Sequence, residues 1–239
     1  MRCADLLGAL ARADALPPSL PRGCADRRGR SALSLAAGGG AAPAALEALR
    51  AAGYATDGAD RDGLTPLSYA AQHGRTAAAN WLLDHGADAA HADVFGVAPV
   101  HKAAAFGRAT ILADMLRRDA SLAAAPVAGT ERADPTFEAV SHAEHPLHLV
   151  CRSGWSTTAA QRVVSARVLL GAGAPLDAVD ARGDTPLHAC AACAEVDLCR
   201  LLLAAGANRR SRDGNGRPPS DRVPSAAPLV RAELTLRGC

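Results

Sequence analysis

The chain has 239 residues, of which 49% are hydrophobic and 3% aromatic, and its formal net charge at pH 7 is +2. Charges of both signs are spread along the sequence, so composition gives no electrostatic reason to expect a nucleic-acid or anionic-membrane partner. No apolar run approaches the roughly 18 residues of a membrane span, and the seven cysteines are an odd number, unlike the even sets of small disulfide-framed domains. We therefore expect a monomeric intracellular protein, cytoplasmic or nuclear, with reduced cysteines.

The first expected element is an N-terminal helix. Ala and Leu dominate residues 1–16, and Pro17 then ends the pattern. Charges at Asp5 and Arg12 interrupt the apolar stretch, which is typical of a soluble helix rather than of a secretory signal. We predict that residues 1–25 form a capping helix and a linker.

The best-defined structural unit of the chain is residues 181–213. Thr185 is a suitable helix N-cap, and Pro186 fits the first helical position, where a missing N–H costs nothing. Residues 198–203 give a second helix a wide apolar face, and Gly206 can end that helix in a left-handed conformation. Two short helices and a turn cannot bury their own apolar faces, so the unit requires copies of itself.

The copies recur with a period of 33 residues, as between Pro66 and Pro99 or between Leu170 and Leu203. The openings of the copies are Thr65–Ser68, Ala98–His101, His145–His148 and Thr185–His188, and the closings are Trp81–Asp88, Leu169–Ala174 and Leu202–Asn208. This period, with T-P-L-H opening each copy and L-L-x-x-G-A closing it, resembles the ankyrin repeat.

The resemblance implies an all-α ankyrin-repeat solenoid, with a helix-turn-helix and a β-turn or hairpin in each repeat and with terminal capping half-repeats. We expect about five repeats within residues 26–217, near 28–59, 60–93, 94–121, 143–180 and 181–213. Helix pairs should start near Ser31, Thr65, Ala98, His145 and Thr185. Spacings longer than one period predict inserted loops near residues 122–143 and 155–162, and residues 218–239 are expected to form a C-terminal partial repeat or cap.

Three cysteines could in principle serve a zinc- or thiol-dependent protein. Cys190 and Cys193 form a C-x-x-C pair, and Cys199 follows them. No second pair completes a zinc set, and buried free cysteines behave as small hydrophobic side chains. We therefore predict structural cysteines and no metal.

A second cluster, residues 142–148, contains three histidines and a glutamate. The resemblance implies that His148, like His101 and His188, hydrogen-bonds the backbone between neighbouring hairpins. That role accounts for the repeated histidines without catalysis, so we expect no catalytic residue, no metal and no cofactor.

A third cluster, residues 209–212, contains three arginines and could be a nuclear-import or RNA-contact patch. Asp213 and Asp221 interrupt it, and no aromatic residues alternate with the arginines. A solvated cap is the favoured interpretation, and no nucleic-acid partner is predicted.

The resemblance implies a non-enzymatic scaffold or adaptor that binds one or more partner proteins on the concave ankyrin surface. The candidate contact residues are Arg61, Asp62, Leu64, Gln72 and His73 in the second repeat, Val94, Phe95, Val97 and Phe106 in the third, and Arg182 and Asp184 in the fifth. The third set is apolar, and its two phenylalanines are either a binding hot spot or packing residues under the inserted loop.

A second function within the same class is a substrate-recognition subunit of a ubiquitin ligase. That function requires a recruitment box after the repeats, and residues 223–239 are short for one.

Overall fold

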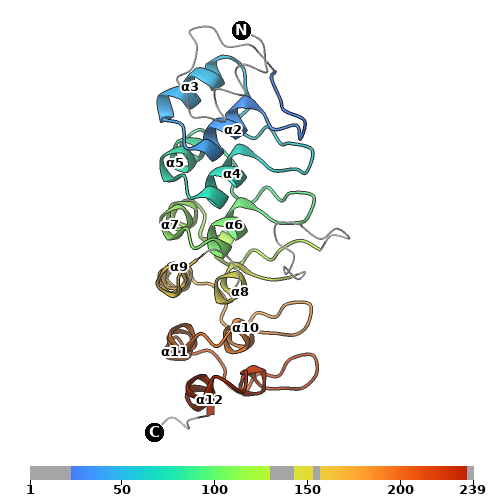
Figure 1. Ribbon diagram of the computed structural model, residues 1–239, viewed down its shortest axis with the longest axis vertical. Helices are drawn as coiled ribbons and strands as arrows, with labels where there is room; N and C mark the ends of the chain where they lie inside the picture. The colour runs from blue at the N-terminus through green and yellow to red at the C-terminus, as the bar shows by residue number, and fades with distance from the viewer. Residues whose placement is uncertain (1–22, 130–142, 153–156, 236–239) are drawn as a thin grey trace. The chain divides into compact units, whose positions relative to one another are not determined.

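A computed structural model describes residues 23–129, 143–152 and 157–235 of the chain (Figure 1). Within these ranges there are eleven α-helices, two 3-10 helices and no β-strand, so the all-α fold class is confirmed. The predicted helix over residues 1–16 and most of the insertion near 122–143 lie outside the described ranges. The chain divides into two compact units, Met1–Ala103 and Ala104–Cys239, which are taken separately below.

The first unit contains two complete helix pairs and most of a further helix. Its helices are α2 (Ala32–Gly39), α3 (Pro43–Ala51), α4 (Pro66–His73), α5 (Thr76–Asp84) and the first part of α6 (Pro99–Ala105). The inner helices α2 and α4 pack on each other beside the hairpin loops, and the outer helices α3 and α5 pack behind them (Figure 1).

Local sequence explains where α4 begins and ends. The Ser68 backbone N–H donates to Thr65 Oγ1 at 3.3 Å, and Pro66 occupies the first turn. Gly74 ends the helix in the left-handed conformation, with a φ of 70°. Small buried side chains such as Ala70 let the inner helices approach closely.

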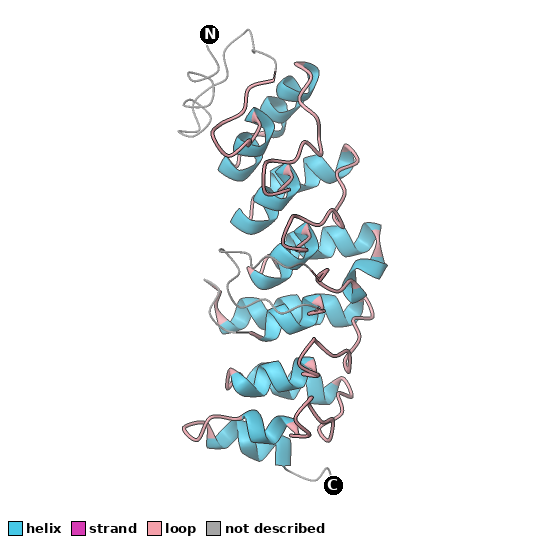
Figure 2. Cartoon of the chain, turned by 90° about the vertical axis from the view of Figure 1, so that its right-hand side faces the viewer, coloured by secondary structure: helices cyan, strands magenta, loops and turns pink. Residues whose placement is uncertain are grey.

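The second unit repeats this arrangement and ends in two further helical segments. Its helices are the end of α6, α7 (Ala109–Arg118), η1 (Ala120–Ala124), α8 (Pro146–Cys151), α9 (Ala159–Gly171), α10 (Pro186–Ala192), α11 (Val196–Ala204), η2 (Pro219–Arg222) and α12 (Pro228–Thr235). Helices α8, α10 and η2 pack in one row, and α7, α9, α11 and α12 pack in another. Loops and turns connect the helices throughout (Figure 2).

The predicted helix starts are confirmed. The inner helices begin at residues 32, 66, 99, 146 and 186, each one residue after the predicted position. Each inner helix is followed by an outer helix, which gives the expected five helix pairs.

The insertion near residues 155–162 differs from the expected loop. Helix α9 already begins at Ala159 and has 13 residues, against nine in α11. Its start is fixed by a reciprocal cap, in which the Gln161 N–H donates to Thr158 Oγ1 at 3.2 Å and the Thr158 N–H donates to Gln161 Oε1 at 2.9 Å. Some of the extra residues therefore lengthen the outer helix. Residues 153–156 lie outside the described ranges.

The insertion near residues 122–143 is closed at its base. The Val127 N–H donates to the Glu144 carbonyl at 2.8 Å, and the Ala143 N–H donates to the Val127 carbonyl at 3.1 Å. Before this base, Asp119 ends α7 and accepts a hydrogen bond from the Ser121 N–H at 2.9 Å. The repeat pattern therefore stops at Asp119 because an aspartate-capped 3-10 turn replaces the usual glycine.

An aspartate begins each of five hairpin turns, a role that the repeat motifs in the sequence did not predict. These aspartates are Asp26, Asp60, Asp93, Asp180 and Asp213. In every case Oδ1 accepts hydrogen bonds from the backbone N–H groups two and four residues later, at 2.8–3.0 Å. A glycine with positive φ lies three residues after each aspartate. The pattern Asp-x-x-Gly thus gives these five hairpins the same shape.

Neighbouring hairpins of the second unit are in direct backbone contact. The Gly214 N–H donates to the Arg182 carbonyl at 2.9 Å. A Cβ atom added at Gly183 would lie 2.5 Å from the Gly214 nitrogen, and Gly183 has a φ of +75°. Both the backbone conformation and the contact therefore require glycine at this position.

Gly183→Ala should destabilise the protein more than Gly173→Ala. Gly173 also has positive φ, at +83°, but a Cβ there would meet nothing within 4 Å. Left-handed strain alone should cost Gly173→Ala about 1–2 kcal/mol, and overpacking should cost Gly183→Ala about 1–3 kcal/mol more. Urea unfolding of both variants measures the difference. Equal losses would contradict close contact between the two hairpins.

Candidate protein-interaction surface

The second oxygen of each hairpin aspartate faces a cation or a hydroxyl group. The Oδ2 partners are Arg30 Nη2 at 2.7 Å, Tyr69 Oη at 2.5 Å, Lys102 Nζ at 2.9 Å, Arg182 Nε at 3.3 Å and Arg217 Nε at 3.3 Å, in chain order. Since Oδ1 fixes the turn and Oδ2 fixes a long side chain, each hairpin presents its polar groups in a defined position. We call the hairpin turns together with the inner helices of each unit the hairpin surface.

In the second repeat the predicted contact residues lie on the surface to different degrees. Arg61, Asp62 and His73 are exposed, whereas Leu64 and Gln72 are half-buried. The exposed side chains stand on an ordered backbone, because the Arg61 N–H donates to the Arg28 carbonyl at 3.1 Å and the Asp62 carbonyl accepts from the Val94 N–H at 2.9 Å. These residues remain candidates for partner contact.

In the third repeat one predicted contact residue is inaccessible. Val97 is 1% exposed, so it packs in the core instead of facing a partner. Val94, Phe95 and Phe106 are half-buried. Phe95 belongs to the first unit and Phe106 to the second.

A buried ion pair supports the hairpin that carries Phe95. The Lys102 Nζ lies 2.9 Å from Asp93 Oδ2, and both side chains are 0% exposed. The other oxygen of Asp93 accepts from the Phe95 N–H at 3.0 Å and from the Val97 N–H at 2.9 Å. The single lysine of the chain is therefore a structural residue that connects α6 to this turn.

In the fifth repeat Arg182 is accessible and Asp184 is not. The Arg182 side chain is 54% exposed, and its Nη2 lies 3.6 Å from Glu144 Oε1. The Asp184 side chain is 12% exposed, and its Oδ1 accepts a hydrogen bond from Arg222 Nη2 at 2.5 Å. The expectation that Asp184 contacts a partner directly is replaced by a supporting role, because its carboxylate is already bound from the neighbouring segment.

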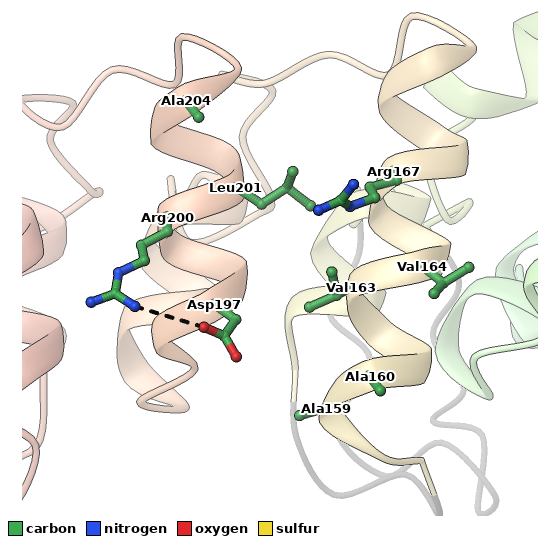
Figure 3. Close-up of a pocket in the computed structure, with 9 residues that line it drawn as sticks. All are labelled: Ala159, Ala160, Val163, Val164, Arg167, Asp197, Arg200, Leu201 and Ala204. Atoms are coloured by element: carbon green, nitrogen blue, oxygen red, sulfur yellow. Dashed lines mark ion pairs between the residues drawn. The ribbon is translucent and has the colours of Figure 1, made fainter.

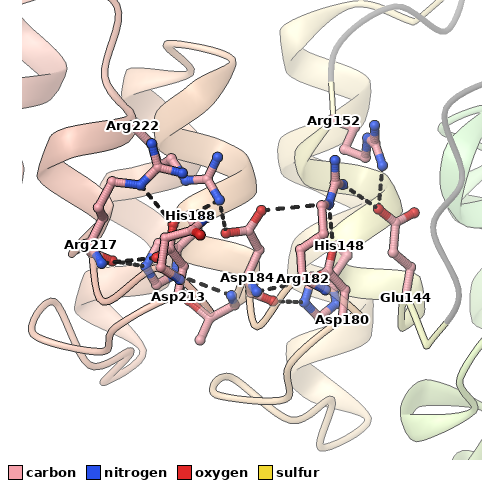
Figure 4. Close-up of polar contacts among 12 residues, drawn as sticks. Glu144, His148, Arg152, Asp180, Arg182, Asp184, His188, Asp213, Arg217 and Arg222 are labelled. Carbon is pink, nitrogen blue, oxygen red and sulfur yellow. Dashed lines mark hydrogen bonds and ion pairs between the residues drawn. The ribbon is translucent and has the colours of Figure 1, made fainter.

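Ion pairs extend from Asp184 along the hairpins of the second unit (Figure 4). Arg222 Nη2 also lies 2.8 Å from Asp213 Oδ2, and at the other end of the group Arg152 pairs with Glu144. We call this group the arginine cluster; its members are Arg152, Arg182, Arg217 and Arg222 with Glu144, Asp180, Asp184 and Asp213.

The arginine cluster covers its carboxylates and exposes two of its four guanidinium groups. The side chains of Glu144, Asp180 and Asp213 are 2%, 1% and 0% exposed, whereas those of Arg182 and Arg217 are 54% and 47% exposed. Backbone hydrogen bonds from Arg217 and Asn215, together with the nearby guanidinium groups, lower the pKa of Asp213 despite the opposing effect of burial. The Asp213 carboxylate therefore favours its charged form beneath the exposed guanidinium group of Arg217.

Two buried histidines connect the inner helices α8 and α10 to the next hairpin along the chain. His148 Nδ1 accepts from the His145 N–H at 3.2 Å, so Nε2 carries the proton and donates to the Asp184 carbonyl at 2.9 Å. His188 Nδ1 likewise accepts from the Thr185 N–H at 3.1 Å, and its Nε2 donates to the Arg217 carbonyl at 3.1 Å. Each histidine thus reaches the hairpin of the following segment, as the resemblance implied.

Family comparison agrees with this geometry. A model for three copies of the ankyrin repeat matches residues 3–93 and 33–124, and a single-repeat model matches residues 182–214. The chain belongs to the ankyrin-repeat family. Together these matches contain the Asp-x-x-Gly hairpins that begin at Asp26, Asp60 and Asp93, and parts of those that begin at Asp180 and Asp213.

The curated relatives of this ankyrin-repeat chain are longer proteins. It is 27% identical over 191 residues to human SH3 and multiple ankyrin repeat domains protein 2, covering 80% of this chain and 9% of that protein. It is 33% identical over 100 residues to human Ankyrin repeat and SOCS box protein 9, covering 41% of this chain and 31% of the relative. The chain therefore spans less than a third of the length of either relative.

Solved structures match over nearly the whole length. The human ASB11 ankyrin repeat domain has a TM-score of 0.75 and 26% identity, with 98% of both chains covered. The ankyrin repeat domain of Bcl-3 has a TM-score of 0.67 at 19% identity, a likeness that supports the fold alone.

The cysteines of the ankyrin repeat at residues 181–213 differ from the prediction. Cys190 in α10 and Cys199 in α11 form a disulfide, with Cα atoms 5.9 Å apart, so the expectation of separate reduced thiols is wrong for this pair. Both occupy core positions that face each other across the helix pair, a proximity that nine residues of sequence separation did not reveal. The zinc- or thiol-dependent alternative therefore loses two of its three candidate side chains.

The described ranges contain neither a cluster of metal ligands nor a membrane-spanning helix. There, no group of three or more His, Cys, Asp or Glu side chains is arranged to bind a metal ion. No helix in the same ranges is long and apolar enough to cross a membrane. His142, a member of the histidine-rich segment, lies outside them.

A groove lies between the outer helices α9 and α11, away from the hairpin turns (Figure 3). Its volume is about 730 Å³, and its residues are Ala159, Ala160, Val163, Val164, Arg167, Asp197, Arg200, Leu201 and Ala204. The Leu201 side chain extends toward Arg167 across the groove (Figure 3). Val164 is 50% exposed there, and the residues that lengthen α9 supply part of one wall.

Replacing Lys102 by Met should destabilise the protein strongly. The change leaves the Asp93 carboxylate buried without its cation, a loss that costs about 3–5 kcal/mol. Arg217→Met is the matched control, because it also removes a partner of a buried hairpin aspartate, but Asp213 keeps Arg222 Nη2 at 2.8 Å and the Arg217 side chain is 47% exposed. That control should lose less than about 1 kcal/mol. Urea unfolding tests both, and similar small losses would show that the Lys102–Asp93 pair is solvated.

The free energy of unfolding should fall as the pH falls from about 6.5 to about 4. Burial lowers the pKa of His148 from 6.5 to about 4, so in this range the unfolded chain binds a proton that the folded chain does not. The full shift corresponds to a loss on the order of 3 kcal/mol. His148→Gln should flatten this pH dependence in denaturant titrations, leaving the part due to His145, whose pKa burial also lowers. An unchanged slope would contradict a neutral buried His148.

Proposed function

We propose that this protein is a non-enzymatic scaffold or adaptor that binds a partner protein through its hairpin surface. The observation that carries the proposal is the repeated hairpin, in which a buried aspartate fixes the turn with one oxygen and a long polar side chain with the other. The ankyrin-repeat fold is generally a non-enzymatic interaction fold, and the family matches identify no catalytic family.

Preorganisation is the physical reason why such hairpins suit binding. Immobilising a flexible side chain at an interface costs about 0.5–1.5 kcal/mol. Arg182 is already restrained by Asp180 and Glu144, and Arg217 by Asp213. A partner that contacts these groups therefore loses less entropy than it would on a surface of unrestrained arginines.

A substrate-recognition role in a ubiquitin ligase is the second candidate. The observation that favours it is the similarity to human Ankyrin repeat and SOCS box protein 9. The role requires a ligase-recruiting segment in addition to the repeats. Co-purification of ligase subunits with the full protein supports this candidate, and capture of partners without them supports the plain scaffold.

Capture of partners from the native cell should depend on the hairpin surface. Single variants Arg61→Ala and Arg182→Ala test the two units separately, and Arg117→Ala is the control, because Arg117 is 69% exposed on outer helix α7. If a hot-spot contact is removed, binding should weaken by about 2 kcal/mol or more, which quantitative mass spectrometry of the captured proteins detects.

Partners lost with either hairpin variant and retained with Arg117→Ala support the proposal. Partners lost with Arg117→Ala and retained with both hairpin variants place the binding site on the outer helices, which contradicts it. Thermal melting of all three variants establishes that each is folded.

A further inference from the structure

The geometry points to an acidic peptide segment as the ligand of the arginine cluster: we infer that aspartate or glutamate side chains of a partner protein bind the outward guanidinium groups of Arg182 and Arg217. This inference rests on the proposed function and adds the chemical class of the partner. It concerns the second unit alone.

Each of the two arginines contacts a buried carboxylate through Nε, and its side chain is about half exposed. Arg217 contacts Asp213 through Nε at 3.3 Å, and Arg182 contacts Asp180 through Nε at 3.3 Å. Within the described ranges no further contact is made by the two terminal nitrogens of Arg217 or by Nη1 of Arg182. A guanidinium has five donors, so these groups retain donors for a carboxylate from outside.

The two groups belong to one connected surface. Arg182 Nε lies 3.9 Å from Asp184 Oδ2, and Asp184 and Asp213 are both bound by Arg222, at 2.5 Å and 2.8 Å. Asp213 in turn binds Arg217. Their backbones also meet, through the hydrogen bond between Gly214 and the Arg182 carbonyl. One extended segment can therefore reach both guanidinium groups (Figure 4).

The charge arrangement favours an anionic partner. The cluster contains four arginines and four carboxylates, but the carboxylates of Glu144, Asp180 and Asp213 are nearly inaccessible. Arg210 and Arg212, which come just before the hairpin that begins at Asp213, are also exposed. A partner approaching this face therefore meets positive groups, and carboxylate binding to arginine is a strong charge-assisted interaction.

A peptide fits better than a nucleic acid. Proteins that bind single strands combine cationic grooves with aromatic side chains on which bases stack. In the described part of the second unit Phe106 is the one Phe, Tyr or Trp residue, and it is half-buried and belongs to α6 and its following turn, not to the arginine cluster. The balanced charge of the cluster also gives little of the long-range field that a polyphosphate chain requires.

The competing explanation is that the exposed arginines only stabilise their own hairpins. In that case Arg182 and Arg217 neutralise Asp180 and Asp213 and have no ligand. Ligand binding separates the two explanations, because a purely structural role gives no site-specific affinity for carboxylates.

The probe is a short fluorescein-labelled polyglutamate peptide, titrated with the full protein at low ionic strength and followed by anisotropy. The test variant is Arg182→Gln with Arg217→Gln. Its control, Arg117→Gln with Arg167→Gln, removes the same charge from exposed positions on outer helices α7 and α9. We expect the dissociation constant to rise about tenfold in the test variant and less than about twofold in the control.

Two further variants separate binding from folding. Arg182→Lys with Arg217→Lys retains both charges and should recover most of the affinity. Single Arg217→Gln leaves Asp213 paired with Arg222 and should weaken binding about threefold without a large change in melting temperature.

Three results would overturn the inference. Equal losses in the test and control variants would mean that polyglutamate responds only to total charge. Tighter, Arg182- and Arg217-dependent binding of a DNA oligonucleotide of equal charge would assign the cluster to nucleic acid. If partner capture requires Arg182 while polyglutamate does not bind, the scaffold function stands and the acidic class of partner is wrong.

Discussion

The aspartate at the start of each Asp-x-x-Gly hairpin makes the interaction on which the structure of both units depends, and its carboxylate is buried at Asp93, Asp180 and Asp213. Such a turn leaves backbone N–H groups without backbone partners, and an unsatisfied donor costs about 1–3 kcal/mol where it is buried. One aspartate oxygen accepts two of these hydrogens in every described hairpin. The second oxygen of the aspartate also needs a partner, which is a cation or a hydroxyl group of a nearby side chain.

The side chain that contacts the second oxygen of the aspartate differs from repeat to repeat. In one it is the Tyr69 hydroxyl, in another the buried Lys102, and in others an arginine. The turn geometry is therefore constant, while the outward chemistry varies from hairpin to hairpin. Such separation allows a repeat protein to change its surface without changing its fold, and the arginine-rich hairpins of the second unit are one outcome.

Periodicity in the sequence predicted the fold, because helix starts depend on short-range signals. Thr65-Pro66 and Thr185-Pro186 encode a cap and a first turn within two residues, and the structure begins helices there. Lengthening of α9 was predicted as a loop, since spacing shows that residues are extra but not whether they continue a helix. The disulfide was missed because it depends on the packing of two helices rather than on local pattern.

The candidate surface was predicted less well, and burial is the reason. Family positions identified Arg182 correctly as exposed, but the same positions included Val97 and Asp184, which the packing of this particular chain covers. Arg222 was missed because it lies 38 residues from Asp184 in sequence and approaches it only through the stacking of a following segment. The recurring Asp-x-x-Gly spacing was the sequence signal that could have predicted the aspartates that fix the hairpin turns.

The buried histidines give the second unit a direction. His148 and His188 each donate to a carbonyl of the hairpin that follows, so α8 and α10 each depend on their C-terminal neighbour for a hydrogen-bond acceptor. Removing the C-terminal hairpin takes the acceptor away from the His188 imidazole, whereas removing segments from the other end leaves that hydrogen bond intact. The two ends of the unit are therefore not equivalent: an inner helix loses a side-chain hydrogen bond when the segment after it is removed, and keeps that bond when a segment before it is removed.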